Sequence, residues 1–242
     1  MNSKRPAGKL PANQTGHLQR PQPRLSARLT GRLCAFLLHL AGSTWRQQAE
    51  GLDVLDEMLK RGERVLAIFW HGGYVPLFFL FAGRHARILS SRSYRGEVIA
   101  AICCRFGYDG GMIPDPAGGT TLDAVRRALQ GCQLSALAVD GPLGPQHVVK
   151  TGAVRLASEH GFAVLPIAAA ADRSWILDGR WDRMEIPRPF ARLSLVCGEP
   201  VAIPAGLPEE EVAIWCSRLR EGLEAAERRA KEMAGAEEGL AI

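Results

Sequence analysis

Short apolar runs alternate with amphipathic segments along most of this chain. Two runs, residues 65–70 and 134–139, are almost purely apolar and about six residues long, which is typical of strands buried on both faces of a parallel sheet. Further strands are predicted at residues 86–90, 112–113, 163–169 and 193–197. Helical periodicity predicts helices between them, at residues 50–61, 98–106, 120–129 and 152–159. The alternation predicts an α/β fold of right-handed βαβ units, with a mostly parallel central sheet flanked by helices in a single domain.

The composition of the two ends sets the predicted boundaries. Residues 1–23 are rich in Pro, Gln, Asn and basic residues and have few large apolar ones, so a disordered tail is predicted there. Residues 24–45 are predicted to form an amphipathic helix, and residues 46–207 the α/β domain. A charged helix with a frayed end is predicted for residues 208–242.

The predicted helix at residues 24–45 has one apolar face and one cationic row. The apolar positions recur at helical spacing, at Leu25, Leu29, Leu33, Phe36, Leu37 and Leu40, and the arginines follow four apart, at Arg24, Arg28 and Arg32. The uncharged part is shorter than the roughly 20 residues that a bilayer span needs. Two interpretations remain: the apolar face packs on the domain, or it lies among lipid headgroups with Trp45 at the interface.

Residues 65–82 are nearly uncharged and long enough to be considered as a membrane span. The sequence His71-Gly72-Gly73 and Pro76 interrupt this stretch in the middle. A strand, a loop and a buried helix are therefore predicted instead of a span.

Composition narrows the classes of partner. The chain has 242 residues, 47% of them hydrophobic and 23% charged, which suits one substantial core. Its net charge of +5 favours anions, meaning acidic lipids, phosphorylated substrates or nucleic acid, and the absence of any nucleic-acid-binding motif disfavours the last. Its six cysteines are scattered, without the spacing of a zinc site, and predict buried thiols in a reducing compartment.

Two predicted strands end in glycine-rich turns that carry one polar residue each. His71 follows the first strand and precedes Gly72 and Gly73, whereas Asp140 follows another and precedes Gly141. Parallel α/β sheets bind ligands at the carboxyl ends of their strands, so a base and a carboxylate are predicted at one edge. The alternative is a hydrogen-bonded core histidine and a turn-forming aspartate.

Several motifs in this order resemble the poorly characterised bacterial branch of the lysophospholipid acyltransferase superfamily. They are Trp70-His71-Gly72, residues 90–97, Asp140-Gly141-Pro142-Leu143-Gly144-Pro145 with Lys150 and Gly152, residues 164–167, Trp181-Asp182-Arg183 and residues 186–190. The resemblance covers roughly residues 30–205. It implies a glycerolphosphate-acyltransferase-like fold and transfer of an acyl group from a thioester to a lipid hydroxyl.

The resemblance also implies roles for individual residues. His71 resembles the general base that deprotonates the acceptor hydroxyl, and Asp140 the later acidic residue. The substrate contacts implied are Gly72, Gly73, Arg92, Ser93, Gly141, Pro142, Lys150 and Gly152, with Gly72 and Gly73 lining an oxyanion pocket. The family carries an acid five residues after the base, where this chain has Pro76. Asp140, Glu97 or a backbone carbonyl is therefore expected to orient the imidazole.

Two hypotheses of different classes follow. The first is an acyltransferase on the cytoplasmic face of the inner membrane, attached peripherally to anionic lipid, with acyl-CoA or acyl carrier protein as donor and a lysophospholipid-like acceptor. It needs no cofactor or metal and binds no nucleic acid. The second is a catalytically inactive lipid- or acyl-binding protein that retains the fold, suggested by Pro76, Arg95 and Pro114. No phosphate-binding loop supports a nucleotide enzyme.

Overall fold

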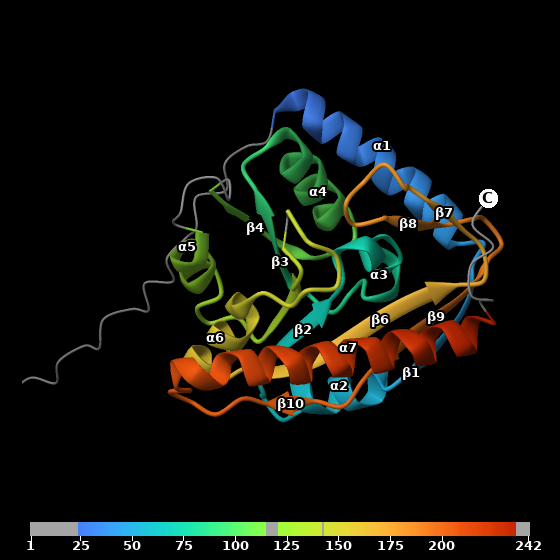
Figure 1. Ribbon diagram of the computed structural model, residues 1–242. Coiled ribbons are helices and arrows are strands. Elements are labelled where there is room, and N and C mark those ends of the chain that lie inside the picture. The colour runs from blue at the N-terminus through green and yellow to red at the C-terminus, as the bar shows by residue number, and fades with distance from the viewer. Residues whose placement is uncertain (1–23, 115–120, 142, 236–242) are drawn as a thin grey trace, which may run out of the picture.

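A computed structural model describes residues 24–114, 121–141 and 143–235, and centres on an eight-stranded sheet (Figure 1). The strand order is β1-β9-β6-β2-β5-β3-β4, with β10 paired to β6. The strands are β1 (Arg46–Glu50), β2 (Val65–Phe69), β3 (Arg87–Ser91), β4 (Asp109–Ile113), β5 (Leu134–Ala138), β6 (Ala163–Ala171), β9 (Arg192–Cys197) and β10 (Val201–Ala202). The predicted tail at residues 1–23 and the end of the predicted C-terminal segment lie outside the described residues.

Five neighbouring strands, β6, β2, β5, β3 and β4, run parallel. Phe69 of β2 pairs with Ala138 of β5, and Ile88 of β3 with Ala136, so the carboxyl ends of these strands meet at one edge of the sheet. The predicted α/β fold with a mostly parallel sheet is confirmed. The pair β9 and β1 runs in the opposite direction, because β9 is antiparallel to β6 and β1 is parallel to β9.

Helices cover both faces of the sheet. They are α1 (Leu25–Gly42), α2 (Leu52–Lys60), α3 (Tyr74–Leu80), α4 (Tyr94–Arg105), α5 (Thr121–Ala128), α6 (Thr151–His160) and α7 (Val212–Ala234), with 3₁₀ turns η1 (His71–Gly73) and η3 (Glu209–Glu211). In β2, Val65 and Ala67 pack into the core formed with α2, α3 and α4, whereas Leu66 and Ile68 pack into the core formed with α5, α6 and α7. Because side chains alternate along a strand, a strand buried on both faces must be apolar throughout.

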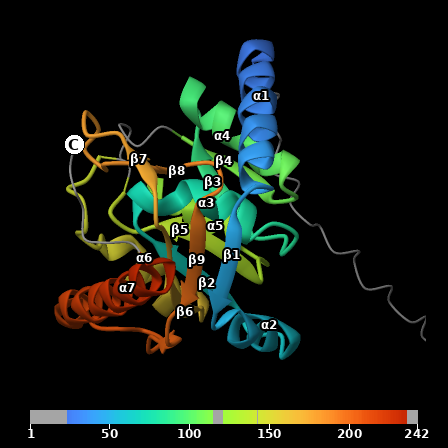
Figure 2. The same cartoon turned by 90° about the vertical axis from the view of Figure 1, so that its right-hand side faces the viewer.

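A two-stranded ribbon, β7 (Ser174–Ile176) and β8 (Glu185–Pro187), stands apart from the main sheet. Its base is bound to the junction of α1 and β1. The amide of Phe190 donates to Thr44 Oγ1 at 2.8 Å, and Trp45 Nε1 donates to the carbonyl of Arg188 at 3.1 Å. Figures 1 and 2 both show this part of the chain beside the C-terminal end of α1.

Helix α1 packs on the domain through its small residues and not through its main apolar face. Its small residues, Ala27, Gly31, Ala35 and Gly42, are buried. Leu38 packs against the core, whereas the other large apolar residues are exposed, namely Leu25, Leu29, Leu33, Phe36, Leu37 and Leu40. A Cβ on Gly31 would overlap Ala101 of α4, so only glycine permits this approach of the two helices. The interpretation that the apolar face packs on the domain is therefore wrong.

Trp45 is buried, with 6% of its surface exposed, and packs edge-on against Phe79 with ring centroids 5.7 Å apart. The prediction that Trp45 lies at a lipid interface is therefore wrong. Among residues 24–114, 121–141 and 143–235, no helix combines the length and apolar character that crossing a bilayer requires.

Candidate active site

His71 follows β2 at the carboxyl edge of the sheet and opens the turn η1. Its Nδ1 lies 2.7 Å from Asp182 Oδ2, and 26% of its side chain is exposed. Because an ionised carboxylate only accepts hydrogen bonds, Nδ1 carries the proton. Nε2 is then the nitrogen left to accept a proton from a substrate.

Asp182 lies in the loop between β7 and β8, and its side chain is fully buried. Arg180 donates from Nε to Oδ1 at 2.8 Å and from its terminal nitrogen to Oδ2 at 2.7 Å. Burial by itself raises the pKa of Asp182, but the hydrogen bonds from Arg180 and His71 outweigh it and hold that pKa below its usual range. Asp182 is therefore a fixed negative charge behind the imidazole at neutral pH.

Asp140 contacts the main chain of His71 and not the imidazole. Its Oδ1 accepts the His71 amide at 2.9 Å, and the carboxyl group is fully buried at the end of β5. Burial raises its pKa, and amide hydrogen bonds oppose that rise only in part. The expectation that Asp140, Glu97 or a carbonyl orients the ring is wrong: Asp182 does so, and Glu97 accepts the amide of Arg24 at 2.9 Å.

Aromatic rings border the imidazole on two sides. Tyr74 meets it edge-on with centroids 5.4 Å apart, and Trp181, the residue before Asp182, lies at 5.2 Å. Burial raises the pKa of the Tyr74 hydroxyl, which keeps this neighbour neutral. The rings restrict the imidazole from the sides while its outer edge stays exposed.

Of the two glycines predicted to line an oxyanion pocket, Gly73 has its amide engaged inside the turn. The amide of Gly73 donates to the carbonyl of Trp70 at 3.0 Å, so this donor is used within the turn. Gly72 is buried, and the carbonyl oxygen of Asp182 covers the position that a Cβ would take. Gly72 therefore lets the loop that carries Asp182 approach the histidine turn.

The Gly72→Ala variant is expected to lose about 1–3 kcal/mol of unfolding free energy, because the added methyl group pushes the Asp182 backbone away. Gly73→Ala is the matched control, since no atom lies within 4 Å of its Cβ position. Chemical denaturation measures both. Equal midpoints for the two variants would contradict the packing role of Gly72.

The remaining predicted contacts lie along the same edge, and none of those described is hydrogen-bonded to His71. Arg92 and Lys150 are exposed, after β3 and at the start of α6 respectively. Ser93 Oγ accepts the amide of Gly96 at 3.1 Å, which makes it the N-cap of α4. Gly141 has φ +72° and lies against the Lys150 side chain, Gly152 is partly buried within α6, and Pro142 lies outside the described residues.

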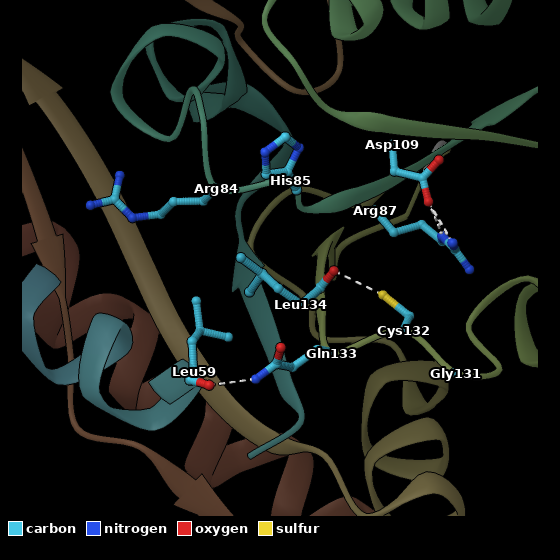
Figure 3. A pocket seen from close by; sticks show the side chains of 9 residues that line it. All are labelled: Leu59, Arg84, His85, Arg87, Asp109, Gly131, Cys132, Gln133 and Leu134. Carbon is cyan, nitrogen blue, oxygen red and sulfur yellow. Dashed lines mark hydrogen bonds and ion pairs between the residues drawn. The ribbon is translucent and has the colours of Figure 1, made fainter. Parts of the chain in front are cut away.

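A depression of about 210 Å³ lies at the opposite edge, where the strands begin (Figure 3). It is lined by Leu59, Arg84, His85, Arg87, Asp109, Gly131, Cys132, Gln133 and Leu134. Arg87 pairs with Asp109 and donates to the Ala128 carbonyl at 2.8 Å, and Arg84 points away and pairs with Asp56 at 3.1 Å. Its arginines already have carboxylate partners, so this depression is a poor anion site and lies far from the histidine.

Residues missed at the sequence level are Asp182 as the orienting acid, Arg180 behind it, and Tyr74 beside it. The sequence Gly179-Arg180-Trp181-Asp182-Arg183 places a carboxylate between two arginines and beside an aromatic ring, a combination that could have marked Asp182 as a candidate. Its partner His71 is 111 residues away, which no local spacing reveals.

Comparisons with known proteins add one relative and no family. No family model matches the chain. The uncharacterized protein RP090 of Rickettsia prowazekii (strain Madrid E) is 27% identical over 146 residues, which cover 58% of this chain and 65% of that protein. The chain thus spans less than two thirds of the relative's length, and the name of that relative states no activity.

Proposed function

We propose that this protein is a peripheral membrane acyltransferase that moves an acyl group from a thioester donor to the hydroxyl of a lysophospholipid-like acceptor. The observation that carries the proposal is the buried Asp182 carboxylate bonded to His71 Nδ1 at the open edge of a parallel sheet. The motifs that resemble the lysophospholipid acyltransferase superfamily select acyl transfer among base-catalysed reactions.

The chemistry needs one base and no enzyme-bound acyl intermediate. His71 Nε2 takes the proton of the acceptor hydroxyl as its oxygen attacks the thioester carbonyl carbon. The carbon–sulfur bond then breaks, and the leaving thiolate takes the proton back from the imidazolium. Asp182 stabilises that imidazolium. The hydrogen bond from the main-chain amide of His71 to Asp140 fixes the start of the turn.

Charged groups along the same edge suit substrates that carry phosphate. Arg92 and Lys150 are both exposed there, and both donor carriers and phospholipid acceptors contain phosphate groups. The exposed apolar face of α1, flanked by arginines, suits an anionic leaflet as the place where the acceptor is found. All six cysteines are free, in keeping with the cytoplasmic side of the inner membrane.

The proposal is tested with the purified full-length chain, labelled acyl-CoA or acyl carrier protein, and a panel of lysophospholipids. Formation of the diacyl product is the expected result. Acyl-donor or lipid binding without turnover would favour the inactive binding protein instead. Release of free fatty acid without acceptor acylation would contradict transfer and indicate a hydrolase.

A further inference from the structure

The β7–β8 ribbon presents an unusual set of apolar side chains to solvent. Trp175 is 49% exposed and Phe190, just after the ribbon, is 68% exposed, with Ile176 and Leu177 also exposed. Large apolar side chains gathered on one element indicate a binding surface. No function considered so far uses them.

Phe190 is also held in a strained backbone conformation. Its φ of +63° lies in the left-handed region, where a bulky residue is rare. The hydrogen bond from the Phe190 amide to Thr44 Oγ1 fixes Phe190 against the end of α1. Strain that keeps an aromatic ring in water points to a partner that receives the ring.

The base of the ribbon is anchored beside the C-terminal end of α1, which carries the exposed apolar residues Phe36, Leu37 and Leu40. Thr44 accepts the Phe190 amide and Trp45 donates to the Arg188 carbonyl, so the residues that follow α1 hold the base of the ribbon. The Arg188 guanidinium lies 5.7 Å from the Trp175 ring centre. Residues 24–46 hold four arginines, Arg24, Arg28, Arg32 and Arg46, and no acidic residue. This surface is therefore apolar with a cationic border.

An anionic bilayer fits this surface better than a second copy does. A second copy of α1 would offer these arginines no counter-charge, because residues 24–46 hold no acidic side chain. Lipid phosphates would neutralise the same arginines, whose long apolar stems can lie along the acyl boundary.

We propose that the β7–β8 ribbon is a second lipid-contacting element, which inserts Trp175 and Phe190 into the headgroup region beside α1. This inference rests on the proposed function and adds to it how the His71 site is oriented relative to the membrane surface. Two contacts fix a rigid body on a plane more strongly than one helix does. The same ribbon carries Arg180 and Asp182, so contact with lipid presents the His71 edge to acceptors within the leaflet.

Vesicle binding of four proteins tests the ribbon. They are the wild type, the ribbon variant Trp175→Ala/Phe190→Gly, the α1 variant Phe36→Ser/Leu37→Ser, and Ile214→Ser as control. Glycine suits the φ of Phe190, and Ile214 is an exposed apolar residue on α7, which packs on the opposite face of the sheet. Vesicles contain phosphatidylcholine with or without phosphatidylglycerol.

The ribbon variant is expected to bind anionic vesicles about tenfold more weakly than the wild type, because it loses two inserted side chains. The Ile214→Ser control is expected to bind as the wild type does. Transfer to a vesicle-borne acceptor should fall in parallel, while transfer to a water-soluble short-chain acceptor stays unchanged. Wild-type affinity in the ribbon variant would overturn the inference.

Two further readouts separate the outcomes. Brominated lipids should quench Trp175 fluorescence, taken as the difference between the wild type and Trp175→Phe, and absence of quenching would contradict insertion. Sedimentation in the absence of lipid tests whether a second copy covers this face. A wild-type dimer that the ribbon variant abolishes would also overturn the inference. Vesicle binding without any acyl transfer would refute the proposed function and leave the lipid contact standing.

Discussion

Replacing His71 with alanine is expected to lower kcat for acyl transfer by about 10²- to 10⁴-fold, the range that a positioned general base contributes. Its Nδ1 is hydrogen-bonded to Asp182, so Nε2 is the nitrogen that can take the acceptor proton. Within the described residues, no other imidazole is hydrogen-bonded to a buried carboxylate. Single-turnover transfer of labelled acyl groups measures the loss.

Two further variants separate chemistry from folding in this experiment. His71→Gln keeps an amide group next to Asp182 but cannot accept a proton at neutral pH, so it should be as inactive as His71→Ala while unfolding as the wild type does. His85→Ala, an exposed histidine at the opposite edge, should retain full activity. Transfer that survives in His71→Ala would refute the mechanism.

Replacing Asp182 with asparagine is expected to lower kcat by about 10²-fold or more, because the neutral amide neither fixes the Nδ1 proton nor stabilises the imidazolium. KM for both substrates should change little, since the residue is buried behind the ring.

Asp178→Asn is the matched control for Asp182. It removes a carboxylate from the same loop, but from an exposed pair with Arg183 at 3.1 Å. Its kcat and pH profile should equal those of the wild type. If Asp182→Asn behaves like Asp178→Asn, the buried carboxylate has no part in catalysis.

The lowered pKa of Asp182 also predicts how its contribution to stability depends on pH. A carboxylate whose folded pKa lies below the unfolded value, about 3.9, stabilises the fold at pH values above the unfolded pKa. That contribution is lost as the pH falls through the lowered pKa of the folded state. The contacts of Asp182 with Arg180 and His71 are therefore present throughout the neutral range.

Hydrophobic pattern was sufficient to predict the central strands and the edge at which the site lies. The apolar runs at β2 and β5 predicted parallel neighbours, and the parallel register then brings the turns of His71 and Asp140 together. The polar strand β1 was missed because all five of its residues are exposed, so burial imposes no pattern on it.

The partner of the imidazole was not predictable in the same way. In the superfamily that the motifs resemble, the acid stands five residues after the histidine, which is Pro76 in this chain. The acid is instead Asp182, on a separate ribbon that packs closely over Gly72. The pattern of α1 likewise revealed two faces but not which one meets the domain. The hydrophobic pattern follows the large apolar residues, whereas here the small residues lie on the buried side and allow close approach to α4.

The reversed packing of α1 has a consequence for the variation that this helix can tolerate. Enlarging Gly31 would push α1 away from α4, and enlarging the buried Ala35 would crowd the core. Leu29 and Leu33 are more than half exposed, so exchanging either for another apolar residue would disturb the core little. Natural variants should therefore keep glycine and alanine at the inner positions and interchange leucine, isoleucine, methionine and phenylalanine freely at the outer ones, the opposite of what a helix of an ordinary water-soluble domain permits.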